Sequence, residues 1–289
     1  MRATDFAVFL ARQAALVEAR LTRVEGSSPR DAGAVMHVAP EALFGTIGGG
    51  RLEHEVIARA RAMLGSGDTG DTGDTGATLE ITLGPDSGQC CGGRVRVELR
   101  AMAPADREAA LARMRRAEAA WPQVLVLGAG HVGRALADLL QHLPVRCRLI
   151  DSRTEELARC GARVETRLSA LPEAEIAAAP AGSAYIVLTH DHGLDFLLVA
   201  AALGRGDAAY VGMIGSATKR ARLQSWCRAT GTGLSLDGLT CPIGAGGVTG
   251  GGGGGDKRPE VIALQVAAEV MAALGGAAAG RTTADASSA

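Results

Sequence analysis

Three glycine-rich turns near the start of the chain carry side chains suited to an anion or a soft metal. They are Gly26-Ser-Ser-Pro-Arg30, Gly48-Gly-Gly-Arg51-Leu-Glu53 and Gly88-Gln-Cys90-Cys91-Gly-Gly93. Glycine before a helix leaves backbone amides open to an anion, and arginine adds charge-assisted hydrogen bonds. A thiolate can act as a soft metal ligand or a sulfur acceptor. We therefore expect Arg30 and Arg51 to bind an anion, and a cysteine of the third turn to be a candidate soft ligand or sulfur acceptor.

One alternative to this expectation stays open, and one kind of metal site is not indicated. A small buried apolar role is common for free cysteine and would account for either thiol. A zinc site is not indicated, because no second Cys-x-x-Cys or nearby histidine pair completes four ligands.

A second candidate site is the G-x-G-x-x-G turn of Gly128, Gly130 and Gly133, which follows an apolar strand pattern. Its glycines permit a tight turn, close approach of a pyrophosphate and close packing of the next helix. Asp151 ends the following strand pattern, where a ribose-binding carboxylate belongs. If a dinucleotide binds, Asp151 favours NAD over NADP, although Arg153 leaves that choice open. The alternative is a domain kept for its shape, with Asp151 capping a helix.

Two further segments follow predicted strands. Thr189-His190-Asp191-His192 comes where open α/β sheets place their ligands. His190 or His192 could bond a ligand oxygen, or the segment could be a turn that satisfies its own backbone. Gly212-Met-Ile-Gly215-Ser-Ala-Thr-Lys219-Arg220 joins a strand to a helix with two cations, which favours anion binding by Gly215, Lys219 and Arg220.

The elements that must position these residues fall into two groups. From residue 122 onward strand and helix patterns alternate, which predicts a parallel sheet with helices on both faces. The N-terminal part has a short helix, closely spaced strands and one long helix, which predicts a small mixed or antiparallel sheet. The fold class is thus α/β, a C-terminal Rossmann-type sheet with a smaller N-terminal mixed α+β domain. The expected boundaries are 1–103 for the first domain, 104–121 for a linking helix, 122–275 for the Rossmann-type domain and 276–289 for a flexible tail.

Composition excludes several classes of protein. The net charge of -1 and the aromatic content of 3% argue against a nucleic-acid binder. No charge-free apolar run reaches the roughly 18 residues of a membrane span, and the N-terminus lacks a signal-peptide pattern. We therefore expect a cytoplasmic protein whose six cysteines are reduced thiols. The Asp-Thr-Gly repeat at 67–76 and the six glycines at 250–255 have the composition of flexible loops.

Taken in order, these turns resemble the xanthine dehydrogenase accessory family, XdhC. The matching segments in the first half are Gly26 to Arg30, Gly33-Ala-Val-Met36, Gly45 to Glu53 and Gln89 to Gly93. In the second half they are Gly128 to Gly133, Ile150 to Arg153, Leu188 to His192, Gly212 to Ser216 with Lys219-Arg220, and Cys241-Pro-Ile-Gly244. The repeat and the glycine run depart from the family pattern and leave loop lengths open.

The resemblance implies a chaperone of molybdenum cofactor (molybdopterin) and not an enzyme. Such a protein protects the cofactor while a cysteine desulfurase installs its terminal sulfur, then inserts it into apo-xanthine dehydrogenase. Cofactor biosynthesis proteins are further candidate partners, and a homodimer is considered. Cys91 looks like the thiol of the family's Cys-Gly-Gly turn, with Cys90 as its neighbour, and is therefore the candidate metal ligand. The candidate cofactor-binding residues are Arg30, Arg51, Cys90, Cys91, Gly128, Gly130, Gly133, Asp151, His190, His192, Gly215, Lys219 and Arg220.

Two other functions stay open at this point. The glycine turn and Asp151 favour an NAD-dependent oxidoreductase, but thiols, arginines and glycines are a poor set for hydride transfer. A sulfurtransferase with a persulfide on Cys91 is a weaker alternative. The sequence leaves open whether the Rossmann-type domain binds any nucleotide.

Overall fold

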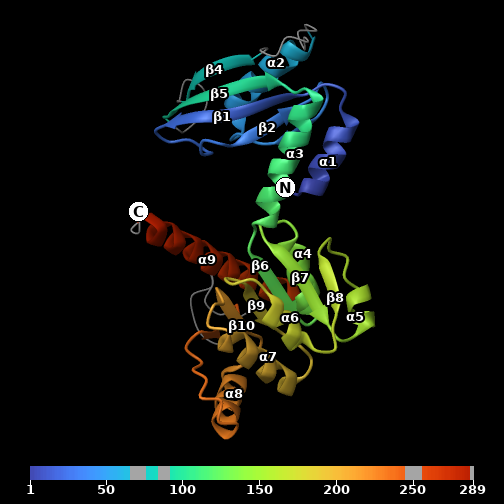
Figure 1. Cartoon of the computed structure of the whole chain (residues 1–289), viewed down its shortest axis with the longest axis vertical. Coiled ribbons are helices and arrows are strands. Elements are labelled where there is room, and N and C mark those ends of the chain that lie inside the picture. Colours follow the sequence, from blue (N-terminus) through green and yellow to red (C-terminus); the bar gives the residue numbers. More distant parts are fainter. Residues whose placement is uncertain (66–75, 84–91, 245–255, 287–289) are drawn as a thin grey trace. The chain divides into compact units, whose positions relative to one another are not determined.

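The computed structural model describes residues 1–65, 76–83, 92–244 and 256–286. Residues 67–75 of the Asp-Thr-Gly repeat, the glycine run, Cys90 and Cys91 lie outside the described residues. The chain forms two compact units, Met1–Ala117 and Glu118–Ala289 (Figure 1).

The first unit is built on a five-stranded sheet in the order β3-β2-β1-β5-β4, with every pairing antiparallel. Its strands are β1 (Val17–Glu25), β2 (Val35–Val38), β3 (Leu43–Gly45), β4 (Gly76–Thr82) and β5 (Arg94–Ala101). Alternate residues of β1, including Val17, Ala19 and Leu21, are buried, as expected for a sheet with one covered face. Helix α2 (Gly50–Gly65) packs Leu52 and Val56 into the same apolar cluster.

Two more helices complete this unit, α1 (Ala3–Arg12) and α3 (Pro104–Ala119). Helix α3 was expected as a linking helix, but it packs on the first unit. Its Ala110 lies in a buried cluster with Phe6 and Leu16. The Arg107 guanidinium donates to the carbonyl oxygens of Gln13 and Ala14 at 2.7 and 2.6 Å. These contacts are long-range, so the charged sequence of α3 did not reveal them.

Glu18 of β1 connects the sheet to α3 through a half-buried charge cluster. Arg20 Nη2 donates to Glu18 Oε1 at 2.8 Å and Arg113 Nη2 to Oε2 at 2.9 Å, while His37 Nε2 lies 3.4 Å from Oε2. Burial alone would raise the pKa of Glu18, but His37 and Arg20 outweigh it and lower the pKa to about 2.

The depressed pKa of Glu18 predicts a pH-dependent stability. A carboxylate with a lowered pKa stabilises the fold above its ordinary pKa, and this contribution disappears as the pH falls toward the folded-state value. We expect this group to account for roughly 3 kcal/mol of stability lost between pH 5 and pH 2. Urea unfolding across this pH range should give a flatter profile for Glu18→Gln than for the wild type. A profile of unchanged slope would contradict the assignment.

The second unit contains a six-stranded parallel sheet in the order β11-β10-β9-β6-β7-β8. The strands are β6 (Gln123–Leu127), β7 (Arg146–Asp151), β8 (Glu165–Leu168), β9 (Ala184–Val187), β10 (Tyr210–Met213) and β11 (Leu239–Thr240). Read from β8, this is the 3-2-1-4-5-6 order of a Rossmann sheet. The predicted fold class is confirmed.

Helices cover both faces of this sheet. Alternate residues of the fully buried strand β6 point to opposite sides, Val124 and Val126 into one core and Leu125 and Leu127 into the other. Helices α4 (His131–Leu140) and α9 (Pro259–Ala286) supply the first core. The second core is supplied by α6 (Pro172–Ala178), α7 (His192–Gly204) and α8 (Ala217–Ala229).

Five elements of the second unit differ from the sequence expectation. Strands β8 and β11 and the short helices α5 (Thr154–Ala158) and α6 were not expected. All four residues of β8 are exposed, so this edge strand has no apolar alternation to signal it. Helix α9 continues to Ala286, so the tail expected at 276–289 is helical for most of its length. Alanine has the highest helix propensity, and no proline interrupts this stretch.

Helix α9 is also long and apolar enough, by length and composition alone, to cross a membrane. The stretch Pro259–Gly276 has a mean hydropathy of 1.3, and 28% of it is buried. The buried residues include Ala263, Val266 and Val270 in the core of the second unit. Packing in this core accounts for the buried part of the apolar pattern, while Leu264 of the same stretch is exposed.

Candidate functional site

Three glycine-rich segments of the first unit lie against one another at one end of its sheet. A Cβ atom on Gly93 would clash with the carbonyl oxygen of Ser27, and one on Gly26 would lie 3.2 Å from Gly93 Cα. A Cβ atom on Gly48 would lie 2.5 Å from Pro29 Cγ. The Gly26–Arg30 turn therefore contacts both the Gly48–Gly50 turn and the Gly92–Gly93 segment. We call these three segments the glycine-turn cluster.

The carboxylate of Glu53 holds the Gly48–Gly50 turn of this cluster by accepting hydrogen bonds. Its Oε1 accepts hydrogen bonds from Thr46 Oγ1 at 2.5 Å and from the Ile47 amide at 3.0 Å. Burial alone would raise the pKa of Glu53, but the bond from Thr46 and those from the amides of the turn lower it. Amides that were expected to face an anionic ligand thus already face the carboxylate of this protein residue.

The other predicted residues of the first unit differ in their surroundings. Arg51 Nε donates to Glu55 Oε1 at 2.8 Å on the exposed face of α2. Arg30 is exposed and makes no hydrogen bond or ion pair with another described residue. The hydroxyl oxygen of Ser28 is buried and likewise lacks a hydrogen-bond partner in the described part of the chain. Cys90 and Cys91 lie outside the described residues. In the sequence, Cys91 directly precedes Gly92.

In the second unit, the three glycines of the G-x-G-x-x-G turn have different roles. Gly128 has φ +127° and lies against the carbonyl oxygen of Leu188, while a Cβ atom on Gly133 would clash with the Gly128 oxygen. Gly130 has no atom close to its missing side chain and precedes α4 without a side-chain cap. Gly128 and Gly133 are therefore needed by the fold, and Gly130 leaves the N-terminus of α4 open.

Both carboxylate oxygens of Asp151 accept hydrogen bonds from neighbouring protein groups. Its Oδ2 accepts from the Ala129 amide at 2.7 Å and from Arg153 Nη2 at 2.9 Å. Its Oδ1 accepts from the amide and Nε of Arg153 at 2.9 and 3.0 Å. Burial alone would raise the pKa of Asp151, but Arg153 and the Ala129 amide lower it. The expected ribose contact would require a change in these bonds.

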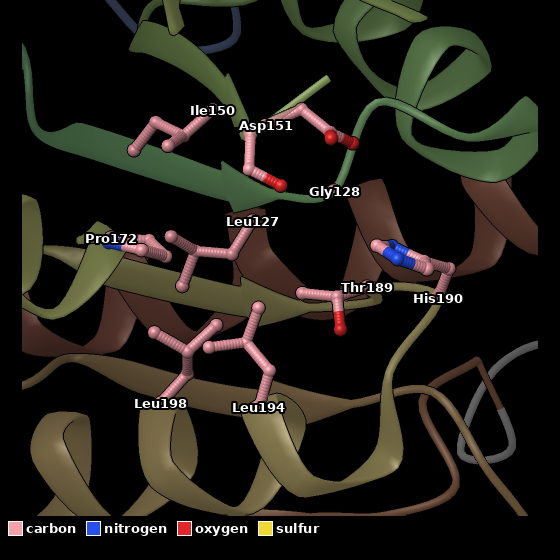
Figure 2. Close-up of a pocket in the computed structure, with 10 residues that line it drawn as sticks. Leu127, Gly128, Ile150, Asp151, Pro172, Thr189, His190, Leu194 and Leu198 are labelled. Carbon is pink, nitrogen blue, oxygen red and sulfur yellow. The ribbon is translucent and has the colours of Figure 1, made fainter. Parts of the chain in front are cut away.

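A small pocket of about 280 Å³ lies at the carboxyl ends of β6, β7 and β9 (Figure 2). Leu127 and Ile150 from the sheet and Leu194 and Leu198 from α7 form its apolar wall. Thr189 and His190 lie at its polar side, as Figure 2 shows. This is the place where the strand order of the sheet reverses, the usual ligand position in such folds.

The Thr189–His192 segment forms the self-satisfying turn that was one of its two expected roles. Asp191 caps α7, since its Oδ1 accepts from the amides of Gly193 and Leu194 at 2.6 and 3.2 Å. The segment thus satisfies part of its own backbone. His190 lines the pocket, and His192 is exposed in the first turn of α7.

Lys219 and Arg220 have protein partners in the structure. Lys219 Nζ forms an ion pair with Asp195 and donates to the Ile214 oxygen at 3.0 Å. Asp195 is fully buried and also accepts from Thr189 Oγ1 at 2.7 Å. Gly215 makes room for the pair, because a Cβ atom there would lie 2.6 Å from Lys219 Cδ.

Arg220 donates to the Leu239 and Leu236 oxygens at 2.6 and 3.0 Å, which holds the loop before β11. These contacts account for both cations without a ligand. Asp195 was missed in the sequence, although a single acid inside the apolar pattern of α7 was a usable signal. Among the described residues, no group of three or more His, Cys, Asp or Glu side chains is placed to hold a metal ion.

The strand order and the glycine turn define the second unit as a Rossmann-type domain. Residues 124–270, just over half of the chain, match the model of the XdhC Rossmann domain, and residues 9–74 match that of the XdhC and CoxI family. The chain belongs to the XdhC family.

No curated protein matches the chain. A solved structure described as a xanthine dehydrogenase from Bacillus halodurans is similar, with a TM-score of 0.74, 17% identity and 96% of each chain covered. At this identity the likeness shows a shared fold over nearly the whole length.

Proposed function

We propose that this chain binds molybdenum cofactor, protects it during sulfuration and inserts it into an apo-enzyme of the xanthine dehydrogenase type. The observation that carries the proposal is the glycine-turn cluster. It brings together turns that lie far apart in the sequence and places Arg30 and Ser28 there without protein partners in the described part of the chain. Membership of the XdhC family supports the link to xanthine dehydrogenase.

The chemistry of these residues suits the cofactor. Molybdopterin carries a phosphate, and the guanidinium of Arg30, which has no partner among the described residues, can donate two hydrogen bonds to one. The buried Ser28 hydroxyl gains a partner when a polar ligand occupies the cluster. Cys91 follows Cys90 directly and precedes Gly92 of the cluster, and thiolates are preferred by soft metals. In this proposal Cys91 is the ligand of the metal and the chain is a carrier, not a catalyst.

The proposal also implies partners. The cofactor must come from its biosynthesis proteins, receive its sulfur from a cysteine desulfurase, and leave for apo-xanthine dehydrogenase. All of these steps would take place in the cytoplasm. A homodimer is compatible with the proposal and is not required by it.

Replacing Cys91 with alanine tests the thiol. We expect Cys91→Ala to lower cofactor affinity by about tenfold or more, the effect of losing about 1.4 kcal/mol of binding, and to lower activation of apo-xanthine dehydrogenase in parallel. The measurements are molybdenum retained after gel filtration and the activity of the loaded enzyme. Cys160→Ala is the matched control, because Cys160 is a half-buried free thiol of the second unit.

Two results would count against the proposal at different levels. If Cys91→Ala and the double Cys90/Cys91 variant load and activate as the wild type does, the thiol role is wrong. If the wild-type protein takes up no cofactor, the carrier role itself is wrong.

A further inference from the structure

The carboxylate of Asp151 has no capacity left for the hydroxyl groups of a ribose. An ionised carboxylate offers about four lone-pair sites. The amide of Ala129 uses one, and the amide, Nε and Nη2 of Arg153 use the others. The side chain is only 4% exposed, so no further donor reaches it from solvent. A ligand that needs an acceptor here must first displace Arg153.

The hydrogen bonds to Asp151 in turn hold the Arg153 guanidinium in place as a hydrogen-bond donor. Two of the five N–H groups of this guanidinium bond to Asp151, and the side chain is 29% exposed. Its Nη1 makes no hydrogen bond to another described residue. The nearest acids on the following helix are Glu155 and Glu156. Glu156 is already paired with Arg134 and Arg159, so it competes little for Arg153.

The pocket beside this pair suits a flat ring. Leu127, Ile150, Pro172 and two leucines of α7 form an apolar slot, and Ser152, which joins Asp151 to Arg153 in the chain, lies at its edge. The volume of about 280 Å³ includes space open to solvent, so the slot offers an apolar surface to a single ring and has no room for a whole dinucleotide. Gly128 lines the same pocket and begins the turn to the uncapped N-terminus of α4, which favours a phosphate.

We propose that the Rossmann-type unit binds an adenine nucleotide whose ribose carries a 2′-phosphate. The base packs against the apolar slot, the 5′-phosphate lies at the start of α4, and the 2′-phosphate accepts hydrogen bonds from the outer N–H groups of Arg153. Asp151 is a positioning residue that holds the Arg153 guanidinium, and Arg153 balances the negative charge of Asp151. This reverses the preference for NAD that Asp151 indicates in the sequence, and it goes beyond the carrier function proposed above.

Calorimetric titration of the full-length protein with 2′,5′-ADP and with 5′-ADP tests the proposal. We expect 2′,5′-ADP to bind the wild type at least about tenfold more tightly at low salt, where a phosphate contact is least screened. Arg153→Gln should remove this difference by weakening 2′,5′-ADP alone. Arg153→Lys keeps the charge without the two-point pairing to Asp151, and should retain part of the preference.

Arg167→Gln is the matched control, because Arg167 is an exposed arginine of β8 in the same unit and pairs with Glu175, which has no part in holding Arg153. It should leave both affinities unchanged. Equal affinities in the wild type, tighter binding of 5′-ADP, or no binding of either nucleotide at millimolar concentration would each overturn the proposal. The wild-type comparison requires no variant to fold, and it involves no molybdenum. Its outcome therefore leaves the carrier function to its own test.

Discussion

Replacing Asp195 with alanine is expected to lower the free energy of unfolding by about 3–5 kcal/mol, because it leaves the Lys219 ammonium buried without its counter-charge. Asp195 is 0% exposed and Lys219 is 9% exposed, so water cannot replace the lost carboxylate without opening the domain. The same change removes the acceptor for the amide and hydroxyl of Thr189. The pair joins α7, α8 and the ends of β9 and β10, so the loss should affect the whole second unit.

Urea unfolding at neutral pH measures this cost, and two controls separate its causes. The double change Asp195→Leu with Lys219→Met replaces the pair by apolar groups of similar size and should recover most of the loss. Glu80→Ala breaks an exposed pair with Arg96 on the first unit and should change little. A single variant no less stable than the double variant would contradict a role for the buried charge.

The architecture of the second unit could be predicted because its signals are local. Strand β6 is an unbroken apolar run followed at once by the glycine turn, and both features lie within about a dozen residues. Strand β8 was not predicted because it has an exposed edge position and no buried residue. The packing of α3 could not be predicted either, because its apolar contacts are with Phe6 and Leu16, which lie far from it in the sequence.

The candidate residues were easier to find than their partners. Lys219 was chosen as a cation at a strand-to-helix turn, but its partner Asp195 is on another helix, and only the packing of α7 against the sheet brings the two together. Asp151 and Arg153 were both noted, yet the sequence could not show that one would use all the acceptor sites of the other. Glu53 was seen only as part of a glycine turn, although its carboxylate holds that turn. Side-chain pairing depends on tertiary geometry, which residue spacing does not determine.

Alanine substitutions in the glycine turn of the Rossmann-type unit should give opposite results at neighbouring positions. Gly128→Ala places a side chain at φ +127° and drives its Cβ into the Leu188 carbonyl oxygen. Backbone strain of about 1–3 kcal/mol and overpacking of about 1–3 kcal/mol then add, for a loss of about 2–6 kcal/mol. Gly133→Ala should also destabilise, because its Cβ would clash with the Gly128 oxygen inside a buried helix–strand contact.

Gly130→Ala is the matched control within the same motif. Its φ of -64° is open to any residue, and no atom lies within 4 Å of an added Cβ. Stability should be unchanged or rise by about 0.4–1 kcal/mol, because alanine restricts the unfolded chain. The added methyl group would nevertheless stand beside the open N-terminus of α4, so Gly130→Ala should weaken phosphate-bearing ligands of this unit while the fold persists. Thermal unfolding and titration with 2′,5′-ADP on the same preparation measure the two effects separately. If Gly128→Ala were as stable as Gly130→Ala, the close approach of this turn to Leu188 would not be a constraint on the fold.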